Sequence, residues 1–206
     1  MGGSDSHNDS GSGFYHDGAR ELQDQFDSRR LADRLEEGAE SVFTDAHREY
    51  IERQSFFFLA TADAQGAPDC SYKGGVPGFV RVLDESTLAF PDYDGNGMFR
   101  SLGNIRVNPQ VGLLFINFEQ PYRWRINGTA TVHDNDPLLE DIPGAQLIVR
   151  VRATHIFKNC PRYIHKAERM EISRHAPRRD YEPPDAEWKQ KPDRRDVLPR
   201  RPPKAD

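Results

Sequence analysis

The stretch from Phe90 to Pro109, FPDYDGNGMFRSLGNIRVNP, decides how this chain folds. It reads as the end of a strand, a glycine-rich turn and a helix over residues 97–108, which stops before Pro109 because proline does not fit a helix interior. Arg100 and Ser101 fall in the first turns of that helix, where free backbone N–H groups and the helix dipole favour an anion. These residues predict an anion site, although an ordinary helix entry with a surface arginine has the same composition.

Short apolar or alternating stretches on both sides of this segment predict strands. Residues 111–118, VGLLFINF, are apolar on both faces, which is typical of a central strand, and residues 122–133 alternate between apolar and polar side chains. Residues 145–157 also alternate, so Phe157 is expected to point inward, and His155 with it. The remaining strand patterns span residues 55–62, 67–73, 79–83 and 87–90.

These patterns amount to six or so strands with short helices between them and no regular alternation of strand and helix. An antiparallel barrel is the natural architecture for such an inventory, because closure removes exposed sheet edges. A doubly wound nucleotide-binding fold is disfavoured, since no G-x-G-x-x-G follows a strand. We therefore predict a mainly β fold, a six-stranded antiparallel barrel with flanking helices.

Capping residues mark the short helices. Ser28 is expected to cap a helix that carries two leucines four residues apart, and Thr44 a second helix. Asp134 or Asn135 can cap a third. The segment Asp63–Gly66 has the composition of a turn between two strands.

The two ends of the chain differ from its middle. Residues 1–13 have no apolar side chain after the first methionine and are expected to be disordered, while residues 14–176 are expected to form the barrel domain with its N-terminal helices. Residues 177–206 hold seven of the 15 prolines and form a basic extension that cannot continue a helix or a central strand. Tyr181 and Trp188 could still lie along a partner surface.

Composition excludes several classes of protein. The chain has 206 residues, a net charge of −5 and a mean hydropathy of −0.80, so a nucleic-acid partner is not expected. No window approaches the ~18 consecutive apolar residues of a membrane helix, and the N-terminus lacks the apolar core of a secretory signal. With only two cysteines, disulfide staples and all-cysteine zinc sites are excluded, and the cytoplasm is the expected location.

A second segment, Asp69–Gly75 (DCSYKGG), could meet the same anion. Ser71 and Lys73 share one face of the predicted strand, and Tyr72 lies on the other. A strand end with a solvated lysine is the simpler interpretation of this segment on its own.

Three segments taken in order resemble the pyridoxamine 5′-phosphate oxidase-like family of FMN-binding split barrels. They are FLATADAQGAPDCSYKGG, TLAFPDYDGNGMFRSLGNIRVNPQVGLLFINF and RINGTATVH, within about Ile51–His165. The resemblance implies a homodimer with two FMN molecules at the subunit interface. It also implies cofactor-binding roles for Ser71, Tyr72, Lys73, Gly74, Asn96, Arg100, Ser101, Arg125, Asn127, Cys160, Arg162 and Tyr163.

The sequence also departs from the oxidase proper, which has an arginine where this chain has Ser71 and Ser-Arg-Lys in place of residues 99–101. The C-terminal pattern that holds pyridoxal phosphate has no equivalent here. The resemblance thus implies an FMN-dependent oxidoreductase acting on a small molecule or electron acceptor, with no catalytic residue assigned. The alternative is a flavin, haem or deazaflavin carrier or sensor without turnover. No metal site is expected, because no His-x-x-x-His pair or carboxylate cluster accompanies His155 and His165.

Overall fold

The computed structural model describes residues 13–185 and 187–192 and divides the chain into two units, residues 1–39 and 40–206. The first unit contains α1 (Asp17–Gln25) and α2 (Arg29–Glu36). Arg20 joins the two helices through ion pairs to Asp33 at 2.6 Å and Glu36 at 2.9 Å. Sequence patterns predicted α2 but not α1, whose first turn is capped by the side chain of His16.

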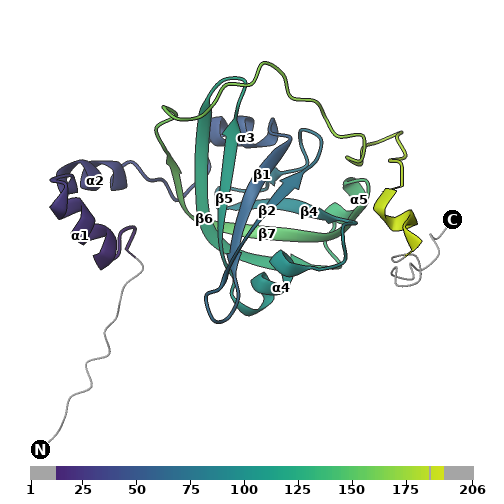
Figure 1. The fold of residues 1–206 in the computed structure, drawn as a ribbon, viewed down its shortest axis with the longest axis horizontal. Helices are drawn as coiled ribbons and strands as arrows, with labels where there is room; N and C mark the ends of the chain where they lie inside the picture. The colour runs from purple at the N-terminus through teal and green to yellow at the C-terminus, as the bar shows by residue number, and fades with distance from the viewer. Residues whose placement is uncertain (1–12, 186, 193–206) are drawn as a thin grey trace, which may run out of the picture. The chain divides into compact units, whose positions relative to one another are not determined.

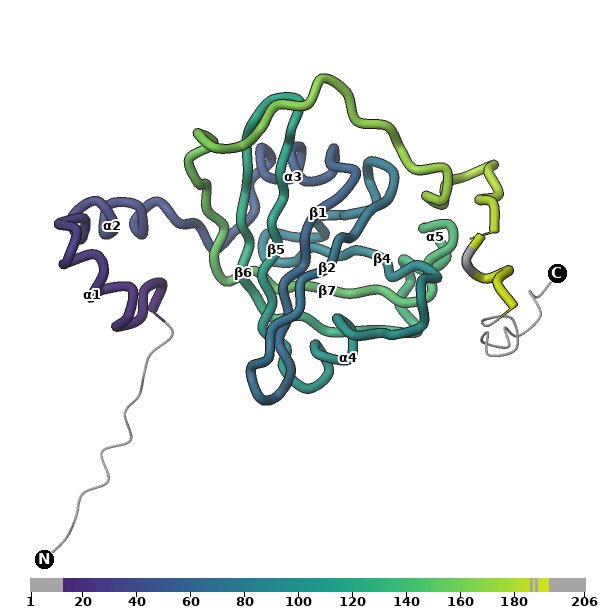
Figure 2. Tube along the Cα trace, in the orientation of Figure 1, coloured from purple at the N-terminus to yellow at the C-terminus, as the bar shows by residue number. Residues whose placement is uncertain are grey.

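The second unit is built on one antiparallel sheet that curls into a barrel (Figures 1 and 2). Its strands are β1 (Phe56–Ala62), β2 (Pro68–Gly74), β3 (Arg81–Val82), β4 (Thr87–Tyr93), β5 (Gln110–Asn117), β6 (Tyr122–His133) and β7 (Ala145–Lys158). The strand order is β2-β1-β5-β6-β7-β4-β3. The chain therefore forms a mainly β split barrel of the kind predicted, with β5 in the interior of the sheet.

The sheet has seven strands, so the prediction of six is one strand short. Each of the seven strand patterns in the sequence corresponds to one of these strands, so the prediction of six undercounted its own patterns. The patterns at residues 79–83 and 87–90 form the hairpin of β3 and β4, in which Arg81 pairs with Ala89 and Val82 with Leu88. Asp84 makes the turn by accepting a hydrogen bond from the backbone N–H of Ser86 at 2.8 Å. Because β3 is only two residues long, it leaves the C-terminal half of β4 as a free edge of the sheet.

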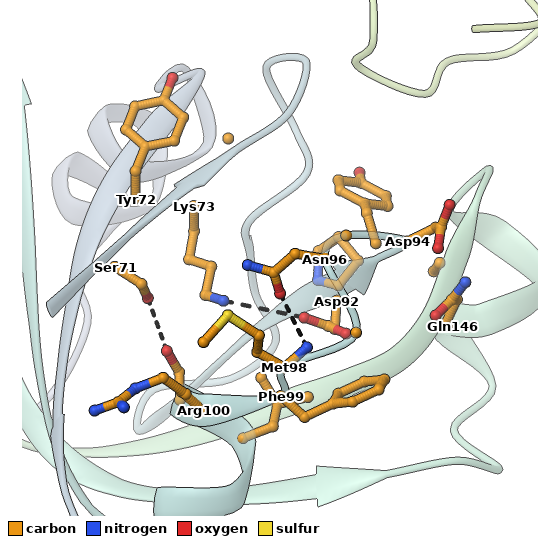
Figure 3. Close-up of a pocket in the computed structure, with 18 of the residues that line it drawn as sticks. Ser71, Tyr72, Lys73, Asp92, Asp94, Asn96, Met98, Phe99, Arg100 and Gln146 are labelled. Atoms are coloured by element: carbon orange, nitrogen blue, oxygen red, sulfur yellow. Dashed lines mark hydrogen bonds and ion pairs between the residues drawn. The ribbon is translucent and has the colours of Figure 1, made fainter. Parts of the chain in front are cut away.

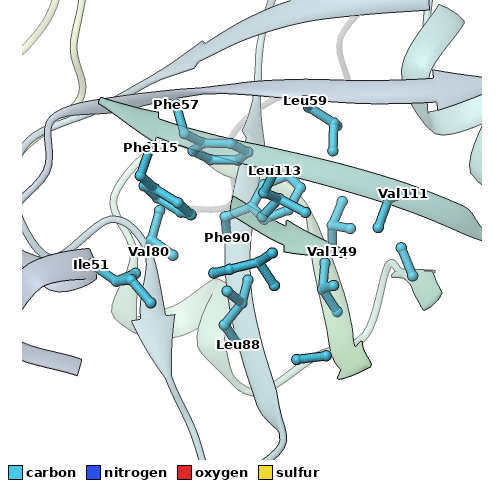
Figure 4. Packing of buried hydrophobic residues seen from close by; sticks show 14 of the residues in the cluster. Ile51, Phe57, Leu59, Val80, Leu88, Phe90, Val111, Leu113, Phe115 and Val149 are labelled. Carbon is cyan, nitrogen blue, oxygen red and sulfur yellow. The ribbon is translucent and has the colours of Figure 1, made fainter. Parts of the chain in front are cut away.

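The barrel interior is filled by large apolar side chains from nearly every strand (Figure 4). Phe57 of β1 lies at its centre, with ring centroids 4.9 Å from Phe90 and 5.0 Å from Phe115. All three rings are completely buried, and each contributes roughly 1.5–3 kcal/mol of burial free energy. This packing fixes the inward face of β1, β4 and β5.

Helices close the two ends of the barrel. Thr44 caps α3 (Asp45–Glu52) as predicted, and His47 completes a capping box by bonding back to the Thr44 backbone. The second helix, α4 (Arg100–Val107), packs against β1, β2 and β6. It begins three residues later than predicted, because the glycine-rich segment before it forms a turn.

The N-cap residue of the short helix α5 (Leu138–Asp141) is Pro137, and the side chain that bonds to the start of this helix is that of Asp136, not of Asp134 or Asn135. Asp136 accepts a hydrogen bond from the Leu138 N–H at 3.0 Å and two from Arg150, at 2.5 and 3.1 Å. These bonds hold the pKa of the Asp136 carboxyl below its usual range, with the Arg150 hydrogen bond as the main cause. The cap thus depends on a partner in β7 that sequence patterns do not reveal.

A β-bulge changes the parity of β7. The register with β6 shifts between Asn127 and Gly128, so β7 holds an extra residue there. As a result Ile156 is fully buried, and Phe157 is half-buried with the Arg125 guanidinium 5.2 Å from its ring. The prediction that Phe157 and His155 point inward is therefore wrong beyond the bulge.

After β7 the chain crosses the α3 end of the barrel and continues towards α5 (Figures 1 and 2). The N–H of Ala167 donates to the Phe118 carbonyl at 2.9 Å, and the Tyr181 hydroxyl donates to the Arg174 carbonyl at 2.8 Å. The 3₁₀ helix η1 (Glu187–Gln190) follows. Residues 1–12, for which disorder is expected, and residues 193–206 of the extension lie outside the described residues, as does the side chain of Trp188.

Within the described ranges, no helix is long and apolar enough to cross a membrane.

Candidate cofactor site

A cavity of about 1380 Å³ opens where the two edges of the sheet face each other across the barrel. It lies between β2, β4 and the start of α4, with Ala145 and Gln146 of β7 and two residues of the C-terminal segment at its rim (Figure 3). Lys73 of β2 and Asp92 of β4 form an ion pair across this gap, with 4.0 Å between Nζ and Oδ1. The split in the barrel is therefore the site of the chain's main cavity among the described residues.

The loop before α4 is shaped to expose backbone N–H groups. Asn96 Oδ1 accepts a hydrogen bond from the Met98 N–H at 3.0 Å, and Gly97 has φ +74°, a conformation that glycine adopts without strain. Phe99 follows with φ +49°, which is unusual for a bulky residue, and makes no side-chain cap to α4. The first N–H groups of α4 are thus left without a side-chain cap from this residue.

Arg100 and Ser101 are the first residues of α4, and Asp69 of β2 holds both. The Asp69 carboxylate accepts hydrogen bonds from Arg100 Nε at 3.4 Å and from Ser101 Oγ at 3.2 Å. Ser71 lies 2.9 Å from Ser101, oxygen to oxygen. Three donors from two distant segments therefore meet at one end of the cavity, as Figure 3 shows for Ser71 and Arg100.

Asp92 differs from Asp69 in its surroundings. Its side chain is 14% exposed, and burial raises the pKa of its carboxyl, opposed by the positive charge of Lys73. At 4.0 Å the Lys73 ammonium is beyond hydrogen-bonding distance. Among the described residues, no side chain other than Lys73 pairs with the Asp92 carboxylate, which lines the cavity.

The cavity lining carries about as many acidic as basic side chains, whereas a site for an anion needs mainly basic ones. Lys189 of η1 pairs with Asp94 at the rim. The described lining contains the cations Lys73, Arg100 and Lys189 and the carboxylates Asp69, Asp92, Asp94 and Asp185. An incoming anion therefore has to share donors that are already paired with carboxylates.

The structure brings seven of the twelve predicted cofactor residues to this cavity. They are Ser71, Tyr72, Lys73, Gly74, Asn96, Arg100 and Ser101. The other five are outside its lining. Arg125 and Asn127 lie on the outer face of β6, and Cys160, Arg162 and Tyr163 are exposed beyond the end of β7.

Asp69, Asp92 and Lys189 also line the cavity but were not among the predicted residues. Asp69 shares the strand parity of Ser71 and Lys73, a signal that could have included it. Asp92 and Lys189 gave no comparable signal, because their placement depends on the curl of the sheet and the path of the C-terminal segment. Among the described residues, no group of three or more His, Cys, Asp or Glu side chains could hold a metal ion.

Residues 43–182 match the sequence profile of the family described as pyridoxamine 5′-phosphate oxidase. The chain belongs to the pyridoxamine 5′-phosphate oxidase family. The match spans the barrel and continues after β7 as far as residue 182, so it includes every lining residue of the cavity except Asp185 and Lys189. No curated protein sequence matches the chain.

Solved structures that are similar to this chain include the following three. A candidate pyridoxamine 5′-phosphate oxidase of Lactobacillus delbrueckii is 22% identical, with a TM-score of 0.47 over 57% of this chain and 95% of that one. HupZ of Group A Streptococcus is 20% identical, with a TM-score of 0.46 over 61% and 98% of the two chains. HutZ, the haem storage protein of Vibrio cholerae, is 20% identical, with a TM-score of 0.40 over 53% and 90%.

Proposed function

We propose that this oxidase-family member binds FMN in the cavity between β2, β4 and α4 and works as a flavin-dependent oxidoreductase. The observation that carries the proposal is the meeting of Ser71, Arg100 and Ser101 at the uncapped start of α4. Free helix N–H groups, a planar guanidinium and hydroxyls are the donors that a phosphate monoester prefers.

The donor set fits a phosphate. Asp69 holds Arg100 and Ser101 in position, and the Arg100 side chain is 63% exposed, so its remaining guanidinium N–H groups are available to a ligand. The aromatic residues of the lining, such as Phe79, Tyr93 and Phe99, supply apolar surface for a planar ring. Burial raises the pKa of Tyr93 to about 12, so its phenol stays neutral near pH 7.

Bound FMN would supply hydride or electron transfer, which is the chemistry of the flavin itself. The chain's own residues bind the phosphate, orient the cofactor and limit access of water. The described lining of the cavity contains no His or Cys side chain that could serve as a proton donor to a substrate. The substrate or electron acceptor is therefore proposed as a small molecule that meets the open side of the cavity.

We also propose a homodimer in which the partner completes the site. The outer face of the sheet carries half-buried apolar residues, including Phe58, Leu114 and Ile116, next to Arg123, whose Nε is buried without a hydrogen-bond partner in the described structure. Five predicted flavin residues, Arg125 among them, lie outside the cavity of their own chain. A second copy against this face would bury the apolar residues and bring Arg125 and Asn127, which share the outer face of β6 with Arg123, into the interface.

An alternative is a carrier that binds its cofactor without turnover. Reduction of the loaded protein by a nicotinamide nucleotide, followed by reoxidation with a defined acceptor, would distinguish the enzyme from the carrier.

Cofactor binding is tested with the purified protein and two flavins. We expect a flavin absorption spectrum and tighter binding of FMN than of riboflavin, which lacks the phosphate. Arg100→Ala should weaken FMN roughly 10–150-fold, the effect of losing a charge-assisted hydrogen bond, and leave riboflavin nearly unchanged. Equal affinity of the wild type for both flavins would overturn the assignment of the phosphate site.

A further inference from the structure

Two of the four carboxylates that line the cavity, Asp69 and Asp92, differ in their hydrogen bonding. Each carboxylate oxygen of Asp69 accepts a hydrogen bond, one from Arg100 and the other from Ser101. Asp92 is unsaturated, since its carboxylate faces Lys73 at 4.0 Å and receives no hydrogen bond from the described residues. A carboxylate this deeply placed is costly unless hydrogen bonds compensate it. The missing donor must therefore come from water or from a ligand.

The 4.0 Å gap between Lys73 Nζ and Asp92 Oδ1 has the dimensions for one hydroxyl group. A single oxygen can lie about 2.8 Å from both atoms, which is a normal hydrogen-bond length. A hydroxyl is also the simplest group that accepts a hydrogen bond from an ammonium and donates one to a carboxylate at the same time. A phosphate oxygen could accept from Lys73 but would be repelled by Asp92.

We infer that Lys73 and Asp92 form a hydroxyl-recognition pair, which makes the cavity specific for phosphate esters of a polyhydroxyl chain. This inference rests on the proposed FMN site and assigns the ribityl chain to the middle of the cavity. Phosphate is held at the start of α4 by Ser71, Arg100 and Ser101, and the hydroxyls beside it meet Lys73 and Asp92. Figure 3 shows the Lys73–Asp92 pair beside Ser71 and the start of α4.

The pair also gives a reason for the balanced charge of the cavity. A site built only for phosphate gains from every added cation, and a carboxylate within it would lower affinity. Asp92 is explained if it accepts a hydrogen bond that only a hydroxylated ligand can donate. A ligand without hydroxyls leaves both Lys73 and Asp92 desolvated and without hydrogen bonds, which is the usual basis of strong discrimination.

The test compares FMN with a flavin that carries its phosphate on an unhydroxylated pentyl chain at N10. We expect the wild type to bind FMN at least about ten-fold more tightly than the phosphopentyl flavin. Asp92→Ala should remove most of this preference, because it should weaken the binding of FMN and leave that of the phosphopentyl flavin unchanged. Asp92→Asn, which keeps an acceptor oxygen but loses the charge, should retain an intermediate preference.

Asp94→Ala is the matched control, because it removes a carboxylate from the rim of the same cavity and should leave the ratio of the two affinities unchanged. If both Asp92 variants bind both flavins more tightly by the same factor, Asp92 acts only through its charge and the inference is wrong. The same holds if the wild type does not discriminate, although FMN binding itself would stand. Failure of the wild type to bind either flavin would overturn the proposed function as well. Should Asp92→Ala not fold, Asp92→Asn decides, since an unchanged ratio in that variant also contradicts the inference.

Discussion

Gly128 of β6 lies so close to Arg152 of β7 that a Cβ atom on Gly128 would be 2.2 Å from the Arg152 carbonyl oxygen. This contact sits at the bulge, where the register shifts between Asn127 and Gly128 and the Thr154 hydroxyl donates to the Asn127 carbonyl at 3.1 Å. Gly128, in the segment RINGTATVH, must therefore be a glycine because the neighbouring strand approaches it so closely. The extra residue of the bulge lies in β7 and sets which face of the barrel Phe157 occupies.

Gly128→Ala should destabilise the protein by about 1–3 kcal/mol, because a methyl group there forces the two strands apart. Urea unfolding followed by fluorescence measures this change. Gly103→Ala in α4 is the control, since nothing lies within 4 Å of a Cβ at Gly103 and alanine should stabilise a helix by up to about 1 kcal/mol. Equal stability of the two variants would show that the bulge yields at little cost.

His47 should make stability depend on pH. Its side chain is 3% exposed, and burial lowers its pKa, with Lys158 acting in the same direction and Glu40 opposing. Because the folded-state pKa of His47 lies below the usual 6.5, protonation of this side chain is less favourable in the folded protein than in the unfolded chain. The resulting contribution to stability is fully present above pH 6.5 and is lost as the pH falls through the folded-state pKa.

His47→Gln tests this link without removing the cap of α3, since glutamine also serves at the third position of a capping box. The variant should lose less free energy of unfolding than the wild type between pH 7 and pH 5. Denaturation curves at both pH values give the two differences directly. Parallel pH profiles for the two proteins would mean that His47 titrates alike in the folded and unfolded states.

Leu114→Asp should give a monomer if the outer face of β5 pairs two copies of the chain. Obligate interfaces bury ~2,000 Å² or more, and a charge at the centre of an apolar contact opposes association. Light scattering at micromolar concentration should find a dimer for the wild type and a monomer for the variant. Leu31→Asp replaces an exposed leucine of α2 and serves as the control. A folded wild-type monomer at that concentration would contradict the dimer.

Local signals predicted the parts of the site that depend on neighbouring residues. Arg100 and Ser101 were assigned to a helix start because glycines precede them and Asn108-Pro109 ends the helix. Asp92 was missed because its role depends on Lys73, which reaches it only after the sheet has curled. The parity of Phe157 failed for a similar reason, since one extra residue in β7 is invisible without its partner strand.

The last prediction concerns the C-terminal segment, which contributes Asp185 and Lys189 to the rim of the cavity. Lys189 pairs with Asp94, and Arg174 anchors η1 through Glu187 at 2.9 Å. The segment buries little apolar surface beyond Ala176, so its removal should cost the barrel little stability. Its position predicts that it screens a bound flavin from solvent.

A variant that ends at Pro177 keeps the contact of this proline with the Gly144 turn and removes everything after it. We expect it to fold with FMN bound and to show greater quenching of the flavin by iodide than the full chain. Lys189→Ala, which releases the segment from Asp94 without shortening the chain, should raise quenching in the same direction by a smaller amount. Unchanged quenching in both variants would mean that the segment does not cover the cofactor. Loss of soluble protein in the shortened variant alone would place the segment in the folded core, because Lys189→Ala leaves that core intact.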